Sequence, residues 1–69
     1  MAGRWYYICE AAELEAVRRV LPVAPGEPRC SRAGDLVILR LTAYVDGAIS
    51  HAQAAAKMQT DAWRRDDEQ

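Results

Sequence analysis

The residues of this sequence that could perform chemistry are one histidine, His51, and two cysteines, Cys9 and Cys30. A cysteine next to a histidine can act as a nucleophile, but the pair also needs an orienting acid within hydrogen-bond reach. Nothing in the sequence around Cys9 or His51 indicates such an arrangement. We therefore interpret His51 as a partly exposed structural residue, and we predict no catalytic residue and no enzymatic activity.

The two thiols and the distant histidine also lack the paired spacing of a zinc site, and the chain has no phosphate-binding loop. We predict no metal and no cofactor. Cys9 and Cys30 fall on two expected strands, so a disulfide between them is possible if those strands are neighbours. Two cysteines in a reducing compartment are more often thiols, and we favour the thiol form while leaving the bridge open.

The charge balance excludes a strongly basic or acidic protein, because nine basic and ten acidic side chains give a net charge of −1. Eight of the nine cations are arginine, which suits bidentate recognition and stacking on aromatic rings, although a GC-rich genome explains the same bias. The acidic residues gather in the first half of the chain, where they form either a solvated surface or a surface that mimics phosphates. They are Glu10, Glu13, Glu15, Glu27 and Asp35.

Alternation of apolar and polar residues predicts the strands. Arg4–Cys9 is rich in aromatic residues on both faces, which indicates an inner strand or one covered on both sides. Leu36–Val45 begins with four apolar residues and then alternates, which is typical of a central strand. Between them we expect a short strand at Pro28–Ser31 and a turn at 32–35.

Apolar residues at helical spacing predict two helices. Ala11–Leu21 carries one stripe of Leu14, Val17, Val20 and Leu21, and Pro22 ends it. The second helix runs from about Ala48 to Arg65, capped by Asp46 or Ser50. Its expected apolar arc comprises Ala48, Ile49, Ala52, Ala55, Ala56, Ala62 and Trp63.

These elements predict an α/β (α+β) mini-domain, in which two helices pack on a small, mostly antiparallel sheet of about three strands. A parallel arrangement of the first and long strands is the alternative. We expect residues 1–69 to form a single compact domain, with 66–69 as a frayed tail. One core should contain Leu14, Val17, Leu21, Val37, Leu39, Leu41, Ile49 and Trp63.

The chain has no apolar segment typical of a secretory signal and none of the roughly 20 apolar residues that a membrane helix needs. We expect a cytoplasmic protein that does not contact membranes. Short chains without signals or chemical sites are common among phages and mobile elements, where many inhibit host machinery. The sequence therefore predicts a non-enzymatic, protein-binding inhibitor of a larger host protein or ribonucleoprotein complex, with anti-CRISPR proteins as an example, present as a monomer or homodimer.

Two stretches are the candidate partner-binding surfaces, because binding residues concentrate on loops of a rigid scaffold. The first carries Glu27, Arg29, Arg32 and Asp35, and the second, at the far end of the long strand, carries Tyr44 and Asp46. The alternative is a nucleic-acid-binding accessory protein with an aromatic and basic sheet face. That face would combine Trp5, Tyr6, Tyr7 and Tyr44 with Arg29, Arg32 and Arg40. The charge balance disfavours direct binding of nucleic acid.

Overall fold

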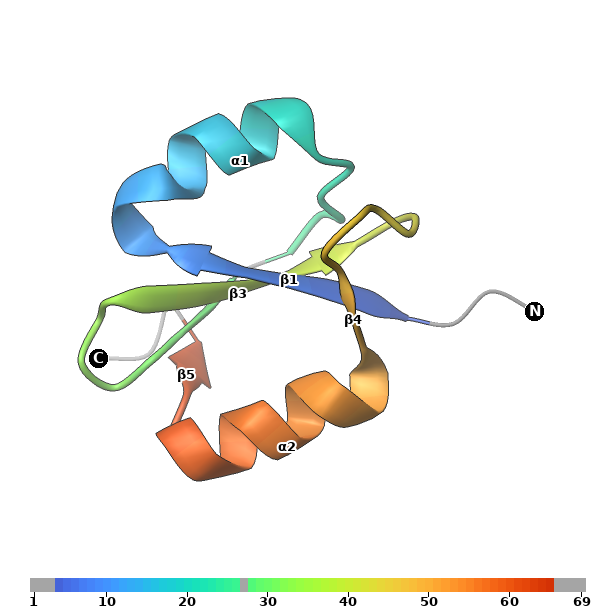
Figure 1. Ribbon diagram of the computed structural model, residues 1–69. Helices are drawn as coiled ribbons and strands as arrows, with labels where there is room; N and C mark the ends of the chain where they lie inside the picture. Colours follow the sequence, from blue (N-terminus) through green and yellow to red (C-terminus); the bar gives the residue numbers. More distant parts are fainter. Residues whose placement is uncertain (1–3, 27, 66–69) are drawn as a thin grey trace.

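An antiparallel sheet lies between two helices in the computed structural model, which describes residues 4–26 and 28–65 (Figure 1). The elements are β1 (Trp5–Glu10), the 3₁₀ turn η1 (Ala11–Glu13), α1 (Leu14–Val20), β2 (Arg29–Cys30), β3 (Leu36–Leu41), β4 (Ile49–Ser50), α2 (His51–Asp61) and β5 (Arg64–Arg65). The sheet order is β4-β1-β3-β2-β5, with α1 on one face and α2 on the other. The predicted α+β class with two helices and an antiparallel sheet is confirmed, but the sheet has five strands instead of about three.

The centre of the sheet is the pairing of β1 with β3. These strands are antiparallel, with Trp5 opposite Leu41 and Glu10 opposite Leu36, so the parallel alternative is wrong. Side chains of a strand alternate between its two faces. Because both faces of this sheet carry a helix, β3 needs apolar residues on both, and Val37, Ile38 and Leu39 are all buried. This confirms the predicted central position of the long strand.

The long strand ends at Leu41 and does not continue to Val45 as predicted. The backbone N–H of Thr42 donates to the Pro22 carbonyl at 2.8 Å, and its hydroxyl donates to the same oxygen at 3.1 Å. Val23 also forms an isolated bridge with Leu41. The chain at Thr42 is thus tied to the segment after α1, so the alternating pattern beyond it belongs to a loop.

The first helix lies where the sequence predicts it, beginning with η1 and ending before Pro22. The backbone N–H of Ala11 donates to the Asp35 carbonyl at 2.8 Å, which ties the start of η1 to the turn before β3. Leu14 and Val17 pack on the core of the α1 side. Val20 is 78% exposed, so its place in the predicted apolar stripe is wrong.

The second helix is shorter than the predicted Ala48–Arg65, because both ends of that segment are strands. β4 pairs with β1, and Ser50 then caps α2 by accepting a hydrogen bond from the Gln53 backbone N–H at 3.2 Å. The helix ends at Ala62, whose φ of 52° is left-handed, and β5 returns to pair with β2. The later start also shifts the buried face, which centres on the fully buried Ala54, a residue outside the predicted arc.

The sheet divides the apolar residues into two layers, so the prediction of one core is wrong. On the α1 side, Cys9, Val37 and Leu39 form the buried cluster. On the α2 side, Ile38 is 3% exposed and Ala54 is 0% exposed. Of the eight predicted core residues, Ile49 pairs with Tyr6, and the Trp63 indole donates a hydrogen bond to the Lys57 carbonyl in α2 at 3.2 Å, so both belong to the α2 side. Within the described residues, no helix is long and apolar enough to cross a membrane.

Leu39 is among the largest fully buried side chains, so its truncation should destabilise the protein strongly. We expect Leu39→Ala to lower the free energy of unfolding by about 2–5 kcal/mol, which is a large part of the stability of a domain of this size. Urea unfolding followed by circular dichroism measures this. The matched control is Val20→Ala, which should change the stability by less than about 0.5 kcal/mol. Equal midpoints for Leu39→Ala and wild type would show that this layer is not the core.

Candidate functional site

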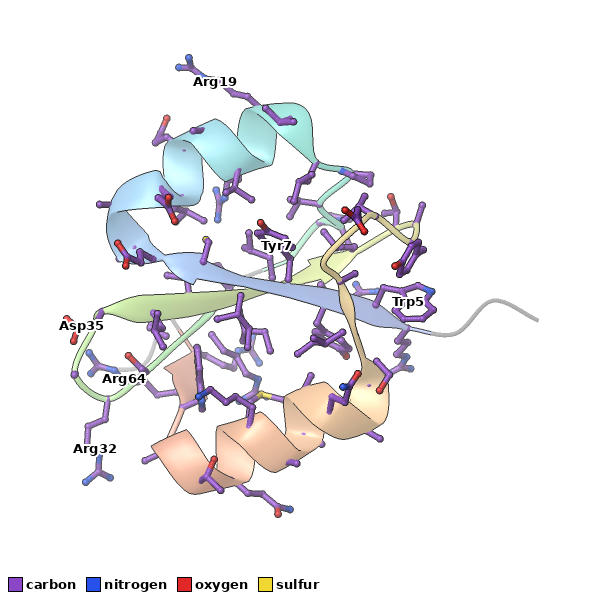
Figure 2. The ribbon with its side chains drawn as sticks, viewed as in Figure 1. Trp5, Tyr7, Arg19, Arg32, Asp35 and Arg64 are labelled. Atoms are coloured by element: carbon purple, nitrogen blue, oxygen red, sulfur yellow. The ribbon has the colours of Figure 1, made fainter. Side chains whose placement is uncertain are left out.

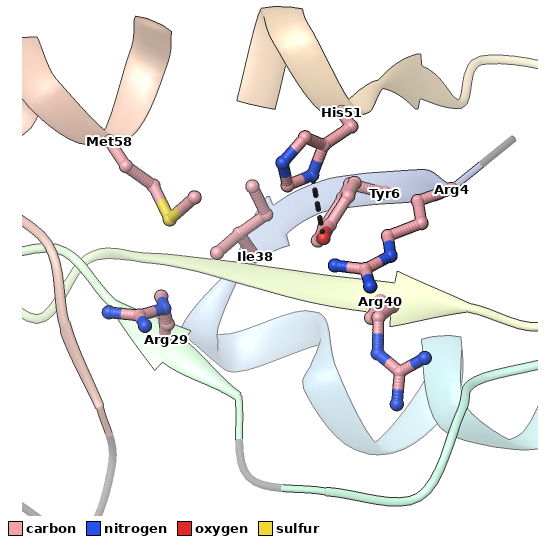
Figure 3. Close-up of a pocket in the computed structure, with 7 residues that line it drawn as sticks. All are labelled: Arg4, Tyr6, Arg29, Ile38, Arg40, His51 and Met58. Carbon is pink, nitrogen blue, oxygen red and sulfur yellow. Dashed lines mark hydrogen bonds between the residues drawn. The ribbon is translucent and has the colours of Figure 1, made fainter. Parts of the chain in front are cut away.

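A pocket of about 320 Å³ opens on the α2 side of the sheet (Figure 3). Its lining combines three arginines, two ring side chains that share a hydrogen bond, and two apolar residues. They are Arg4, Arg29, Arg40, Tyr6, His51, Ile38 and Met58. Most come from β1, β2, β3 and α2, and Arg4 directly precedes β1, so the pocket forms only when these elements come together.

Strand register brings the sheet residues of the pocket together. Tyr6 in β1 lies directly opposite Arg40 in β3, and Arg29 in β2 lies opposite Ile38. Because directly opposed residues of an antiparallel pair project from the same face, these side chains share the α2 face of the sheet. On α2, His51 and Met58 are seven residues apart, which places them about two turns apart on one side of the helix.

Tyr6 and His51 form the only side-chain hydrogen bond among the lining residues that the structure describes. The Tyr6 hydroxyl lies 3.1 Å from His51 Nδ1, and the direction of donation depends on the histidine tautomer. The two rings are tilted by 40°, with their centroids 5.6 Å apart. This contact fixes the start of α2 against β1 and leaves both rings at the edge of the pocket, as Figure 3 shows.

The described lining of the pocket is positively charged. Three guanidinium groups line it, and none of the described lining residues is acidic. Arginine stays charged in proteins and presents five donors in a rigid fork. Arg40 uses one donor in a long hydrogen bond of 3.5 Å to the Pro25 carbonyl, so most of its donors remain available. The arrangement can bind an anion, and its described lining contains no cysteine, serine or carboxylate that could serve as a nucleophile.

The predicted partner-binding residues do not gather in one place. Arg29 lines the pocket, whereas Arg32 and Asp35 lie in the exposed turn between β2 and β3. Tyr44 and Asp46 lie in the loop after β3, at the opposite end of that strand. Figure 2 shows this separation, with Arg32 and Asp35 at one end of the sheet and Trp5, which contacts Tyr44, at the other. The prediction for Glu27 lies outside the described residues.

The aromatic and basic residues of the alternative hypothesis do not form one face either. Trp5 and Tyr7 project to the α1 side by strand alternation, and the exposed Tyr44 packs edge-on against Trp5 with ring centroids 4.8 Å apart. Tyr6 and Arg40 project to the α2 side. Since a helix covers each face, the described part of the chain offers no open sheet on which bases could stack.

Two of the acidic residues from the first half of the chain lie near each other. Glu10 and Asp35 line one hollow at the end of the sheet where η1 begins. Glu13 follows Glu10 in η1, and its Oε1 accepts a hydrogen bond from the Glu10 backbone N–H at 3.4 Å. This acidic end lies where β1 finishes, away from Arg4 at the start of that strand.

The two cysteines are not bridged to each other. Cys9 and Cys30 both pair with Val37, from opposite sides of β3. Two strand spacings separate their Cα atoms by about 10 Å, beyond the roughly 7 Å limit for a disulfide. The sheet also separates Cys9, on the α1 side, from His51 on the α2 side. Among the described residues, no group of three or more histidine, cysteine, aspartate or glutamate side chains could hold a metal ion.

Sequence reasoning missed the pocket as a unit. It assigned Tyr6, Arg29 and Arg40 to a possible basic face, but treated His51 separately and gave Arg4 and Met58 no role in a site. The usable signal was the alternation that places Tyr6 with Ile8, and Ile38 with Arg40, on one face. What the sequence could not supply was the register that brings these two strands together.

No family model, no curated protein and no solved structure matches this chain.

The Cys9 thiol should be chemically inert in the folded protein. Burial, and to a smaller extent the nearby Glu13 carboxylate, raises the pKa of Cys9, so less of the reactive thiolate is present near neutral pH. We expect Cys9 in a Cys30→Ser variant to react with Ellman's reagent at pH 8 far more slowly than glutathione does. Guanidinium chloride should restore the rate of an exposed thiol. Fast reaction without denaturant would contradict the buried position of Cys9.

Proposed function

We propose that this protein is a non-enzymatic binding module that docks on a larger protein or nucleoprotein assembly and holds an anionic group of that partner in the arginine pocket. The observation that carries the proposal is that Arg4, Arg29 and Arg40 all line one pocket, without an acidic residue among its described lining. Guanidinium groups bind carboxylates and phosphates through bidentate, charge-assisted hydrogen bonds.

Binding fits the pocket better than catalysis does. Its polar groups are guanidinium, phenol and imidazole, which recognise and orient an anion. Acid–base or nucleophilic catalysis would need a reactive group close to the bound ligand, and Cys9 lies across the sheet. Tyrosine and arginine are also the residues that most often dominate binding energy in interfaces, as the pair of Tyr6 and Arg40 would here.

The biological role that we propose is inhibition of a host protein or ribonucleoprotein complex by a small phage- or mobile-element-type protein, comparable in kind to anti-CRISPR proteins. Such assemblies expose carboxylates and phosphates at the surfaces that they use for their own ligands. A small protein with a basic pocket can occupy those surfaces without performing a reaction.

A second candidate function is that of a nucleic-acid-binding accessory protein, which the arginines and Tyr6 favour. In this protein such binding would use the pocket, because the sheet faces are covered by helices. The salt dependence of affinity for nucleic acid grows with the number of phosphates that the protein neutralises, so removal of an arginine that binds phosphate makes this dependence weaker. The same arginine substitutions therefore test both candidates, and the identity of the captured partner separates them.

The test removes two pocket charges without introducing an acid. We expect Arg29→Gln combined with Arg40→Gln to reduce capture of the partner by the tagged protein from a lysate of its native host by at least about tenfold, the effect of removing charge-assisted hydrogen bonds. Quantitative mass spectrometry measures the capture. The control is Arg18→Gln combined with Arg19→Gln, which makes the same charge change at exposed positions of α1 outside the pocket. Equal reductions for the two double variants would show a general charge effect and contradict the proposal.

The loop surfaces predicted from the sequence can be compared in the same experiment. We expect the charge reversals Arg32→Glu and Asp35→Lys, and separately Tyr44→Ala with Asp46→Ala, to leave most of the capture intact, because these residues lie outside the pocket. Thermal melting controls for folding. Loss of capture in a loop variant that melts normally would assign the docking surface to that loop instead.

A further inference from the structure

We infer that the outer edge of β1 is a second docking site, which binds an extended segment of a partner protein with a basic residue two positions before an apolar one. The segment joins the sheet as a further strand beside Ile8. Three features carry this inference: unpaired backbone groups, an apolar hollow next to them, and the carboxylate of Glu13 at one end of that hollow. The site is separate from the arginine pocket on the α2 side.

The outer edge of β1 is only partly covered. β1 spans Trp5–Glu10, but β4 pairs with Trp5 and Tyr6 alone. No other described strand lies on this side of β1, because its second neighbour, β3, lies on the opposite side. Figure 1 shows the rest of β1 at the open side of the sheet, between α1 and α2. The segment 7–10 can therefore pair with another strand along its outer edge.

The backbone of Ile8 faces this edge. The N–H of Ala24, which flanks β3 opposite β1, donates to the Arg40 carbonyl at 2.8 Å, so the backbone groups of Arg40 point away from β1. These groups alternate in direction along a strand, so those of Leu39 point towards its partner Tyr7. Tyr7 in turn points its N–H and C=O at β3, and Ile8, the next residue, points its own outwards. Such outward groups are a template for a further strand.

An apolar hollow of about 270 Å³ lies next to this edge, between β1 and α1. Its lining consists of one tyrosine, one glutamate and four aliphatic residues, namely Tyr7, Glu13, Ala16, Val17, Val20 and Leu21. Tyr7 points from β1 towards α1 (Figure 2), and Val20 is 78% exposed. The hollow is smaller than the roughly 300–1,000 Å³ of small-molecule sites. It suits an apolar side chain of a macromolecule, which covers the exposed Val20.

The two ends of the hollow differ in charge. Glu13 ends η1 and lies beside the end of β1, because its Oε1 accepts a hydrogen bond from the Glu10 backbone N–H at 3.4 Å. α1 then runs back across β1 (Figure 1), which brings Val20 and Leu21 to the part of the hollow near Tyr7. A segment that follows β1 thus meets a carboxylate at one end and aliphatic side chains at the other. This complementarity selects a partner with a cation and an apolar residue.

The register of the sheet gives the spacing of these two residues. Every pair of named strands is antiparallel, so the added segment is placed antiparallel to β1. Its residue opposite Ile8 exchanges both backbone hydrogen bonds. The residues on either side lie opposite Tyr7 and Cys9, and they share the α1 face with them. The residue opposite Cys9 comes first and lies towards Glu13, so it is basic, and the residue opposite Tyr7 is apolar.

The probe is the peptide acetyl-Thr-Lys-Thr-Val-Thr-amide, added to the isotope-labelled full chain and followed by NMR. We expect the backbone amide signals of Tyr7, Ile8 and Cys9 to shift along one saturating curve, and the Ile8 amide to exchange more slowly with solvent. A peptide N-methylated at its central threonine cannot donate to the Ile8 carbonyl and should bind about fivefold more weakly. A lack of saturable shifts, or equal binding of the N-methylated peptide, would overturn the inference.

A charge exchange locates the peptide on the protein. Wild type should prefer the lysine peptide over the same peptide with glutamate in place of lysine, and Glu13→Lys should reverse this preference, each by about two- to fivefold. The matched control is Glu15→Lys, which makes the same charge change at an exposed position of α1 outside the hollow and should keep the preference for lysine. Thermal melting verifies that each variant folds. An unchanged preference in Glu13→Lys, or an equal reversal in Glu15→Lys, would contradict the assigned register.

A second copy of the chain is the other occupant that this edge could take, and sedimentation velocity of the protein alone distinguishes it. We expect a monomer whose edge is open to the peptide. A dimer that the peptide dissociates would assign the edge to self-association and overturn the inference. Arg29→Gln combined with Arg40→Gln should bind the peptide as wild type does, because both arginines lie in the other site. The docking edge and the arginine pocket can therefore fail separately.

Discussion

The register between β1 and β3 is the constraint on which the rest of this structure depends. It places Tyr6 opposite Arg40 on one face of the sheet and Cys9 opposite Val37 on the other. A shift by one residue would move every side chain of one strand to the opposite face. Arg40 would then enter the apolar layer beneath α1, where an unpaired guanidinium is very costly to bury. The same register that forms the core therefore forms the pocket.

The two faces of the sheet differ in how much apolar surface they bury. The α1 face is apolar, and Val37 and Leu39 on it are each 2% exposed. On the α2 face, the buried apolar residues are Ile38 and Ala54, and three arginines line the pocket beside them. The small side chain of Ala54 allows α2 to approach the sheet closely, which brings His51 and Met58 to the pocket from either side of it. The larger buried apolar cluster thus lies on the α1 face, and the pocket lies on the α2 face.

Much of the fold could be predicted from local patterns. The aromatic β1, the apolar β3 and the first helix ending before Pro22 carry strong signals within their own segments. The errors arose where pairing with distant residues decides the structure. β4 and β5 have two residues each, so their strand conformation depends on pairing with β1 and β2. The alanine-rich segment between them has a helical pattern, and this pattern extends over both short strands in the sequence. The pocket was missed for the same reason, because Arg4, Arg29 and Arg40 line one pocket only once the sheet is assembled.

The central claim is that this pocket is the anion-binding site of the protein. NMR of the arginine side-chain Nε–H groups, recorded while inorganic phosphate is added at constant ionic strength, tests it most directly. If the pocket binds phosphate, the signals of Arg4, Arg29 and Arg40 shift together along one saturating curve, while those of Arg18, Arg19 and Arg32 stay in place. Uniform small shifts of all arginines, without saturation, would contradict the claim, because they would show that phosphate meets this protein only as a diffuse counterion.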